Sequence, residues 1–138
     1  MKPNAAISYH PDGFDTSIER LMGRQAAGEG FLEGLVRYGE VDRLFCFTRT
    51  KDEFDDFTRL VERASQTPAP TEFIPESRPD QLKQPGCLFF SGPVLRPRAI
   101  QRATIGAGAY SLCGLTHTLS TTAVIDAIGD YLTAPLEA

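Results

Sequence analysis

The stretch RLFCFTRTKDEFDDFTRLVERA, residues 43–64, decides the fold expected for this chain. It opens with a nearly continuous apolar run, which is typical of a strand buried on both faces of a parallel sheet. Thr50 follows with Glu53 three residues later, the spacing of a capping box at a helix start. The apolar residues then recur on one helix face: Phe54, Phe57, Val61 and Ala64. A buried strand followed by an amphipathic helix is therefore predicted here.

Strands and helices alternate on both sides of this stretch. The sequence predicts strands at 5–9, 43–48, 72–74, 86–90 and 110–115. It predicts helices at about 18–38, 50–64, 97–105 and 121–132. The first and last helices have apolar faces of their own, made of Ala27, Phe31, Leu35 and Tyr38 and of Val124, Ile125, Ile128 and Leu132. Such alternation indicates a layered α/β fold with a mainly parallel sheet.

Length and composition narrow the class of protein. A chain of 138 residues is expected to form a single domain, residues 1–138. Its net charge of −4 argues against generic binding to nucleic acid or to anionic membranes. No apolar run approaches the ~20 residues of a transmembrane helix, and no signal peptide is recognisable. The three cysteines are far apart and form no CxxC pair, so reduced thiols and a cytoplasmic location are expected.

The segment Cys113-Gly114-Leu115-Thr116-His117-Thr118-Leu119-Ser120-Thr121-Thr122 is the most suggestive place for chemistry. A strand ends and a helix begins here, and helix starts offer free backbone N–H groups to anions. His117 stands at the carboxyl end of the strand, where an imidazole can hydrogen-bond a sugar hydroxyl or move a proton. The alternative is that His117 simply packs or caps the strand end, since no partner acid is identifiable.

The turn after the first strand, residues 10–17, should lie on the same edge of the sheet. Gly13 permits a ligand to approach the backbone closely, although Pro-Asp-Gly is also an ordinary turn sequence. His10, which precedes a proline, is expected only to be held in an extended conformation.

Two further patterns carry weaker signals. Gly28-Glu29-Gly30 with Gly34 lies inside a helical pattern rather than directly after a strand, so it is no dinucleotide fingerprint. Close packing of helix on sheet is the better explanation of these glycines. Between Asp80 and Asp126 there is no acidic residue, and the segment contains Lys83, Arg96, Arg98 and Arg102. This stretch either favours an anionic ligand near His117 or is a solvated loop.

Two segments of the chain resemble the amino-terminal half of bacterial family 4 (group 1) glycosyltransferases. These are Tyr110–Thr118 and Leu21–Leu32, read as YSLCGLTHT and LMGRQAAGEGFL, and Leu132-Thr133-Ala134-Pro135-Leu136 resembles the continuation. The resemblance implies the acceptor-side, Rossmann-like three-layer domain of the two-domain GT-B architecture. It also implies transfer of a sugar from a nucleotide-sugar donor to an acceptor with retention, usually without a metal and with no other cofactor.

The resemblance assigns roles by position. His117 would contact the transferred sugar as the catalytic histidine, and Gly13, Phe14, Thr116 and Thr118 would contact the substrates. Family chains are several times longer and carry a second domain that holds most donor contacts. We therefore expect little transferase activity from this polypeptide alone.

A non-catalytic α/β interaction domain, which forms a homodimer or recruits a partner chain, is the alternative. A receiver-like or flavodoxin-like domain ranks last, because the strand ends carry Thr48, Ser91 and Thr116 rather than an acidic cluster.

Overall fold

The computed structural model describes residues 4–17, 19, 23–116, 119 and 121–134. Its strands are β1 (Ala5–Ser8), β2 (Leu44–Thr48), β3 (Thr71–Pro75), β4 (Cys87–Phe90) and β5 (Ser111–Gly114). Its helices are α1 (Gly23–Tyr38), α2 (Lys51–Ala64), α3 (Arg96–Ala103) and α4 (Thr122–Gly129). Short 3₁₀ turns are η1 (Pro11–Gly13), η2 (Pro79–Lys83) and η3 (Asp130–Leu132).

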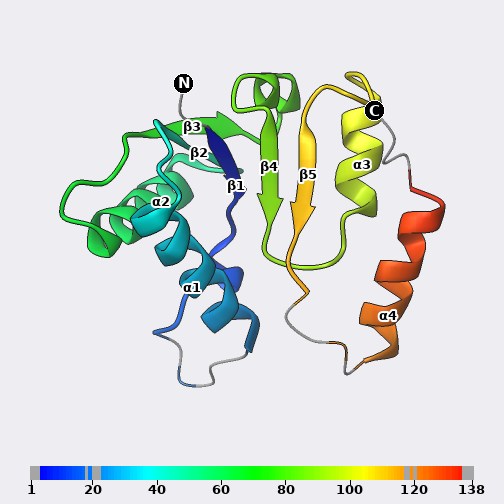
Figure 1. The fold of residues 1–138 in the computed structure, drawn as a ribbon, viewed down its shortest axis with the longest axis horizontal. Helices are drawn as coiled ribbons and strands as arrows, with labels where there is room; N and C mark the ends of the chain where they lie inside the picture. The colour runs from blue at the N-terminus through cyan, green and yellow to red at the C-terminus, as the bar shows by residue number, and fades with distance from the viewer. Residues whose placement is uncertain (1–3, 18, 20–22, 117–118, 120, 135–138) are drawn as a thin grey trace.

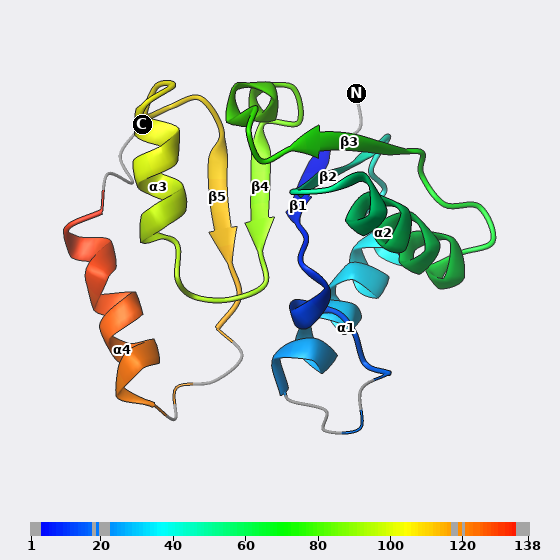
Figure 2. The ribbon, with the colours of Figure 1, turned by 180° about the vertical axis from the view of Figure 1, so that it is seen from behind.

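The described strands form one parallel sheet in the order β3-β2-β1-β4-β5. Helices α1 and α2 pack on one face of this sheet, and α3 lies next to β5 (Figure 1). Arg98 of α3 contacts Ser8 and Phe47 on the opposite face. The arrangement is a three-layer, Rossmann-like α/β fold, which confirms the predicted fold class. The view from behind shows the same layers (Figure 2).

Two apolar clusters hold the layers together. On the α1/α2 face, alternate residues of β1 and β2 pack against the helices, and the buried members include Ile7, Cys46, Leu32 and Phe57. On the opposite face the intervening strand residues gather, among them Ala6, Phe47, Leu88 and Ile74. Strand β2 is buried along its whole length, as its uninterrupted apolar run predicts.

The predicted capping box at the start of α2 is confirmed. The Thr50 side chain accepts the backbone N–H of Glu53, and the Glu53 side chain accepts the backbone N–H of Thr50. The helix buries Phe54, Phe57 and Val61, the same face that the apolar spacing indicates.

The predicted inward face of the last helix is wrong in part. Ile125 is 57% exposed and Leu132 is 92% exposed, and the buried residue of α4 is Ala127. The helix ends at Gly129 and continues as η3, so Leu132 leaves the helical face. In both views α4 lies beyond α3, at the β5 end of the sheet and far from α1 and α2 (Figures 1 and 2). An outlying helix covers little of the core, and its apolar side chains stay exposed.

The face that α1 buries also differs from the prediction. Gln25, Gly28 and Leu32 are buried, Phe31 and Leu35 pack at the margin, and Tyr38 is 78% exposed in the last turn. Of the glycines at 28, 30 and 34, only Gly28 makes a close approach, and its partner is the turn after β1 rather than the sheet. No helix among the described residues is long and apolar enough to cross a membrane.

Candidate functional site

The carboxyl ends of the strands form one edge of the sheet, and a cavity lies on that edge. Strand β1 is flanked by β2 on one side and by β4 on the other, so the direction of winding reverses between β1 and β4. Ligands of open α/β sheets bind in the crevice at this kind of reversal. The cavity, with a volume of about 590 Å³, occupies that position, between the turns that follow β1 and β4.

The turn after β1 forms one wall of the cavity. Gly13 lines it, and the Oγ atom of Ser91 from the β4 turn lies 3.0 Å from the place where a Cβ on Gly13 would stand. Phe14 follows directly, but its side chain is only 1% exposed and packs on Tyr9 with ring centroids 5.1 Å apart. Phe14 therefore anchors the turn in the core, while Gly13 presents backbone to the cavity.

Helix α1 holds the same turn from behind. A Cβ on Gly28 would lie 2.1 Å from the carbonyl oxygen of Gly13, so only glycine lets the helix come this close. The place of the Gly13 backbone in the cavity wall thus depends on Gly28 having no side chain.

Arg49 enters the cavity directly after β2. One of its guanidinium nitrogens lies 3.0 Å from Glu53 Oε1 and 2.6 Å from His10 Nε2. The Arg49 side chain is 57% exposed, whereas that of Glu53 is only 13% exposed. The Glu53 carboxylate therefore holds the Arg49 guanidinium in place, while the guanidinium remains exposed to the cavity.

Glu53 is itself held by several donors. Its Oε2 atom accepts the Thr48 hydroxyl at 2.5 Å and the backbone N–H groups of Arg49 and Thr50 at 3.1 and 3.3 Å. Burial alone would raise the pKa of the Glu53 carboxyl, but the hydrogen bonds from Thr48 and Arg49 outweigh it and hold the pKa below its ordinary value. Glu53 is thus ionised at neutral pH and connects the end of β2 to the start of α2.

A second arginine reaches the cavity from α3. Arg98 donates to Glu76 at 2.7 Å and to Ser8 Oγ at 3.4 Å, and its guanidinium lies 5.2 Å from the centre of the Phe47 ring. Its side chain is 20% exposed, so this ion pair is partly desolvated. Because Ser8, Phe47 and Glu76 come from β1, β2 and the end of β3, Arg98 ties α3 to three parts of the sheet edge.

The wall on the β4 side is built by Ser91-Gly92-Pro93. A Cβ on Gly114 would lie 2.8 Å from the carbonyl oxygen of Gly92, so the end of β5 packs tightly against this wall. The Tyr131 hydroxyl donates to the carbonyl oxygen of Pro93, and Val124 of α4 closes the far side of the cavity. Helix α4 therefore borders the same cavity as the β1 turn, and the end of β5 packs against the Gly92 backbone of the cavity wall.

Three of the five predicted site residues, Gly13, Phe14 and Thr116, lie within the described part of the chain. Gly13 lines the cavity, Phe14 lies in the core, and Thr116 is exposed just after β5, at the same edge of the sheet. His117 and Thr118 lie outside the described residues. The figures show the chain leaving β1 and the chain leaving β5 on the same side of the sheet (Figures 1 and 2).

Sequence reasoning missed most of the charged residues of the cavity, namely Arg24, Arg49 and Glu76, and gave His10 no role. Arg49 and Glu76 each follow a strand directly, and this position was the signal that could have found them. Arg98 does belong to the basic stretch noted in the sequence. Among the described residues, no group of histidine, cysteine and acidic side chains could hold a metal ion.

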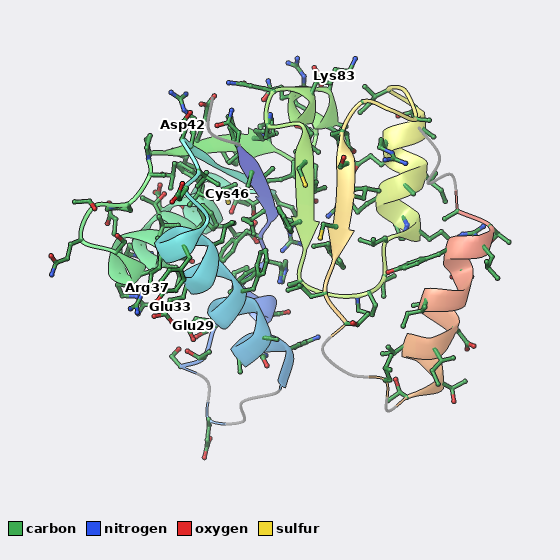
Figure 3. The ribbon with its side chains drawn as sticks, viewed as in Figure 1. Glu29, Glu33, Arg37, Asp42, Cys46 and Lys83 are labelled. Carbon is green, nitrogen blue, oxygen red and sulfur yellow. The ribbon has the colours of Figure 1, made fainter. Side chains whose placement is uncertain are left out.

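A smaller hollow of about 170 Å³ lies between α1 and α2. Glu29 and Glu33 contribute to its wall, and Glu33 pairs with Arg37 at 2.7 Å on the exposed side of α1 (Figure 3). It sits within the helical layer and not at the strand ends, so it is separate from the candidate site.

Comparisons with protein-family models, with curated proteins and with solved structures find no match to this chain.

Proposed function

We propose that this chain is the acceptor-side domain of a sugar-transferring enzyme of the GT-B type. The observation that supports this proposal best is the cavity of about 590 Å³ at the carboxyl edge of the sheet, with Gly13 in its wall. The turn after β1 and the end of β5, where the sequence resemblance places the substrate contacts, both border this edge. Hydroxyl groups of Ser8 and Ser91 and the charged groups of Arg49 and Glu76 surround a volume suited to a polar ligand.

The proposed reaction moves a sugar from a nucleotide-sugar to an acceptor hydroxyl with retention of configuration. The bond between the anomeric carbon and the phosphate oxygen breaks, and the nucleoside diphosphate leaves with that electron pair. A bond forms between the anomeric carbon and the acceptor oxygen, and the acceptor proton passes to the departing phosphate or to water. In this proposal His117 contacts the transferred sugar, with Thr116 and Thr118 beside it. The reaction takes place in the cytoplasm, where Cys46, Cys87 and Cys113 stay free.

The chain by itself contributes only one side of such a cleft. Transition-state stabilisation needs groups held on both sides of the transferred sugar, so we expect turnover only with a second, donor-binding domain.

Transfer assays test this function. Labelled UDP-glucose and GDP-mannose are offered with candidate acceptors to this chain and to a longer parent in which it precedes a second α/β domain. We expect transfer by the parent alone. His117→Ala in the parent should reduce kcat at least tenfold, while Leu119→Ala, an exposed neighbour, should leave it unchanged. Rapid turnover by the single domain, or full activity of the His117→Ala parent, would contradict the proposed role.

An interaction domain is the second candidate, and one observation favours it. Val94, Ile100, Ile125 and Leu132 are between 47% and 92% exposed, and all four belong to the α3 and α4 region. Exposed apolar groups gathered in one region often mark contact with another chain. Light scattering across a range of concentrations distinguishes the two: a stable dimer favours association, and a monomer at high concentration counts against it.

A further inference from the structure

Charged side chains from separate elements converge on the cavity at the carboxyl edge. Arg24 comes from α1, Arg49 from the end of β2 and Arg98 from α3, and they face the carboxylates of Asp12 and Glu76. Arg98 is already paired with Glu76 at 2.7 Å. The side chain of Arg24 has no ion pair or hydrogen bond to any other described residue. Arg49 is also paired, with Glu53 at 3.0 Å, but its side chain is 57% exposed, against 20% for Arg98. The positive charge that a ligand can reach therefore lies on Arg24 and on the exposed guanidinium of Arg49, although the whole chain is acidic.

His10 cannot accept a hydrogen bond from Arg49 and cap η1 at the same time. The guanidinium of Arg49 lies 2.6 Å from His10 Nε2, and the backbone N–H of Asp12 points at His10 Nδ1 from 3.3 Å. Both partners are donors, but a neutral imidazole has only one acceptor nitrogen, and a protonated one has none. When Nε2 accepts from Arg49, Nδ1 carries the proton and η1 loses its cap from His10. The two hydrogen bonds are alternatives.

A bound anion would favour one of these two alternatives. If the guanidinium of Arg49 turns to an anion in the cavity, Nδ1 of His10 is free to accept the Asp12 N–H and restore the cap of η1. Nε2 then carries the proton and becomes a donor on the cavity side. Once the contact between Arg49 and His10 is broken, both side chains can donate to the ligand. With Arg24, they make three donor groups.

We infer that the cavity binds a phosphate monoester, carried by the sugar acceptor, between Arg24, Arg49 and His10. This inference rests on the proposed function and names the class of its acceptor. A tetrahedral dianion has three terminal oxygens to match donors arriving from three elements, and charge-assisted hydrogen bonds of arginine to phosphate are among the strongest in proteins. Ser8 and Ser91, which line the same cavity, are placed to meet sugar hydroxyls.

Calorimetric titration of the full chain with defined probes tests the inference. The probes are glucose 6-phosphate, glucose, sulfate, UDP and uridine. We expect glucose 6-phosphate to bind at least tenfold more tightly than glucose, and sulfate to compete with it. Binding of UDP without binding of glucose 6-phosphate or sulfate would assign the anion to a donor nucleotide and overturn the inference about the acceptor.

Matched variants locate the binding. Arg49→Gln should weaken glucose 6-phosphate at least tenfold, whereas Arg43→Gln should not change the affinity. Arg43 also pairs with a glutamate, at 2.5 Å, but it precedes β2 and lies at the opposite edge of the sheet. Arg24→Gln provides a second test that removes no hydrogen bond or ion pair between described residues, and circular dichroism of this variant checks that it is folded. Unchanged affinity in both cavity variants would refute the site.

The tautomer of His10 provides a measurement that a purely electrostatic effect of the bound anion would not change. In ¹⁵N NMR spectra, with the His10 signals assigned through a His10→Gln variant, we expect glucose 6-phosphate to shift His10 from the Nδ1–H to the Nε2–H tautomer. An unchanged tautomer at saturation would contradict the exchange of partners. If a neutral sugar is transferred by the parent enzyme but no anion binds, this inference fails while the proposed function stands.

Discussion

Replacing Gly28 with alanine should lower the free energy of unfolding by about 1–3 kcal/mol, although alanine is the better helix former. The new Cβ would stand 2.1 Å from the carbonyl oxygen of Gly13, and it would lie 3.3 Å from a ring carbon of Phe14. Neither neighbour can move freely, because one is backbone and the other is buried in the core. Helix α1 must therefore retreat from the turn, and the Gly13 wall of the cavity must shift with it. Chemical denaturation followed by circular dichroism measures the change.

Gly34→Ala is the matched control on the same helix. A Cβ at position 34 meets nothing within 4 Å, so the substitution should raise the free energy of unfolding by about 0.5–1 kcal/mol through the entropy of the unfolded chain. Opposite signs for the two variants are the expected result. Equal stabilisation by both would show that α1 does not press against the turn after β1.

Glu53→Gln should lower the free energy of unfolding at pH 7 by about 1–3 kcal/mol. The carboxylate accepts the buried Thr48 hydroxyl, two backbone N–H groups and the guanidinium of Arg49, and a neutral amide cannot satisfy all of these donors. Glu62→Gln is the control, because Glu62 is an exposed acid of the same helix. Urea titrations of both variants across a pH series provide the measurement.

The pH dependence of this effect follows from the lowered pKa of Glu53. A carboxyl whose pKa is lower in the folded than in the unfolded state stabilises the fold above its unfolded pKa, about 4.3 for glutamate. That stabilisation is lost as the pH falls through the lower, folded-state pKa. The difference between wild type and Glu53→Gln should therefore be full at neutral pH and shrink in acid. A difference that stays constant down to about pH 2 would contradict the ionised network.

Much of the fold could be predicted from local sequence. The buried β2 run, the Thr50 capping box and the apolar face of α2 are each recorded in a few adjacent residues, so periodicity and capping chemistry were sufficient. The α4 face was mispredicted because periodicity shows which residues share a side of a helix but not what that side meets. Ile125 and Leu132 look like core residues in sequence, yet α4 lies at the margin of the sheet.

The candidate site was harder to predict, for a physical reason. Parallel topology brings the ends of β1 and β5 to one edge, and this could be anticipated from strand order alone. The partners of the charged groups could not be predicted, because they are far apart in the sequence. Arg49 and His10 are separated by 39 positions, and Arg98 and Glu76 by 22. The role of Gly28 likewise depends on the Gly13 carbonyl, which only the three-dimensional packing reveals.

The most direct test of the proposed sugar site is to map ligand binding on the amide signals of the whole chain. Glucose 6-phosphate and UDP-glucose are titrated into ¹⁵N-labelled protein, and the perturbed backbone amides are located. We predict the largest changes at Gly13, Ser91 and Gly92, on the two turns that border the cavity. Changes confined to Asp42 and Lys83, at the opposite edge of the sheet (Figure 3), and to Gly86, which directly precedes β4, would contradict a sugar site at the strand carboxyl ends.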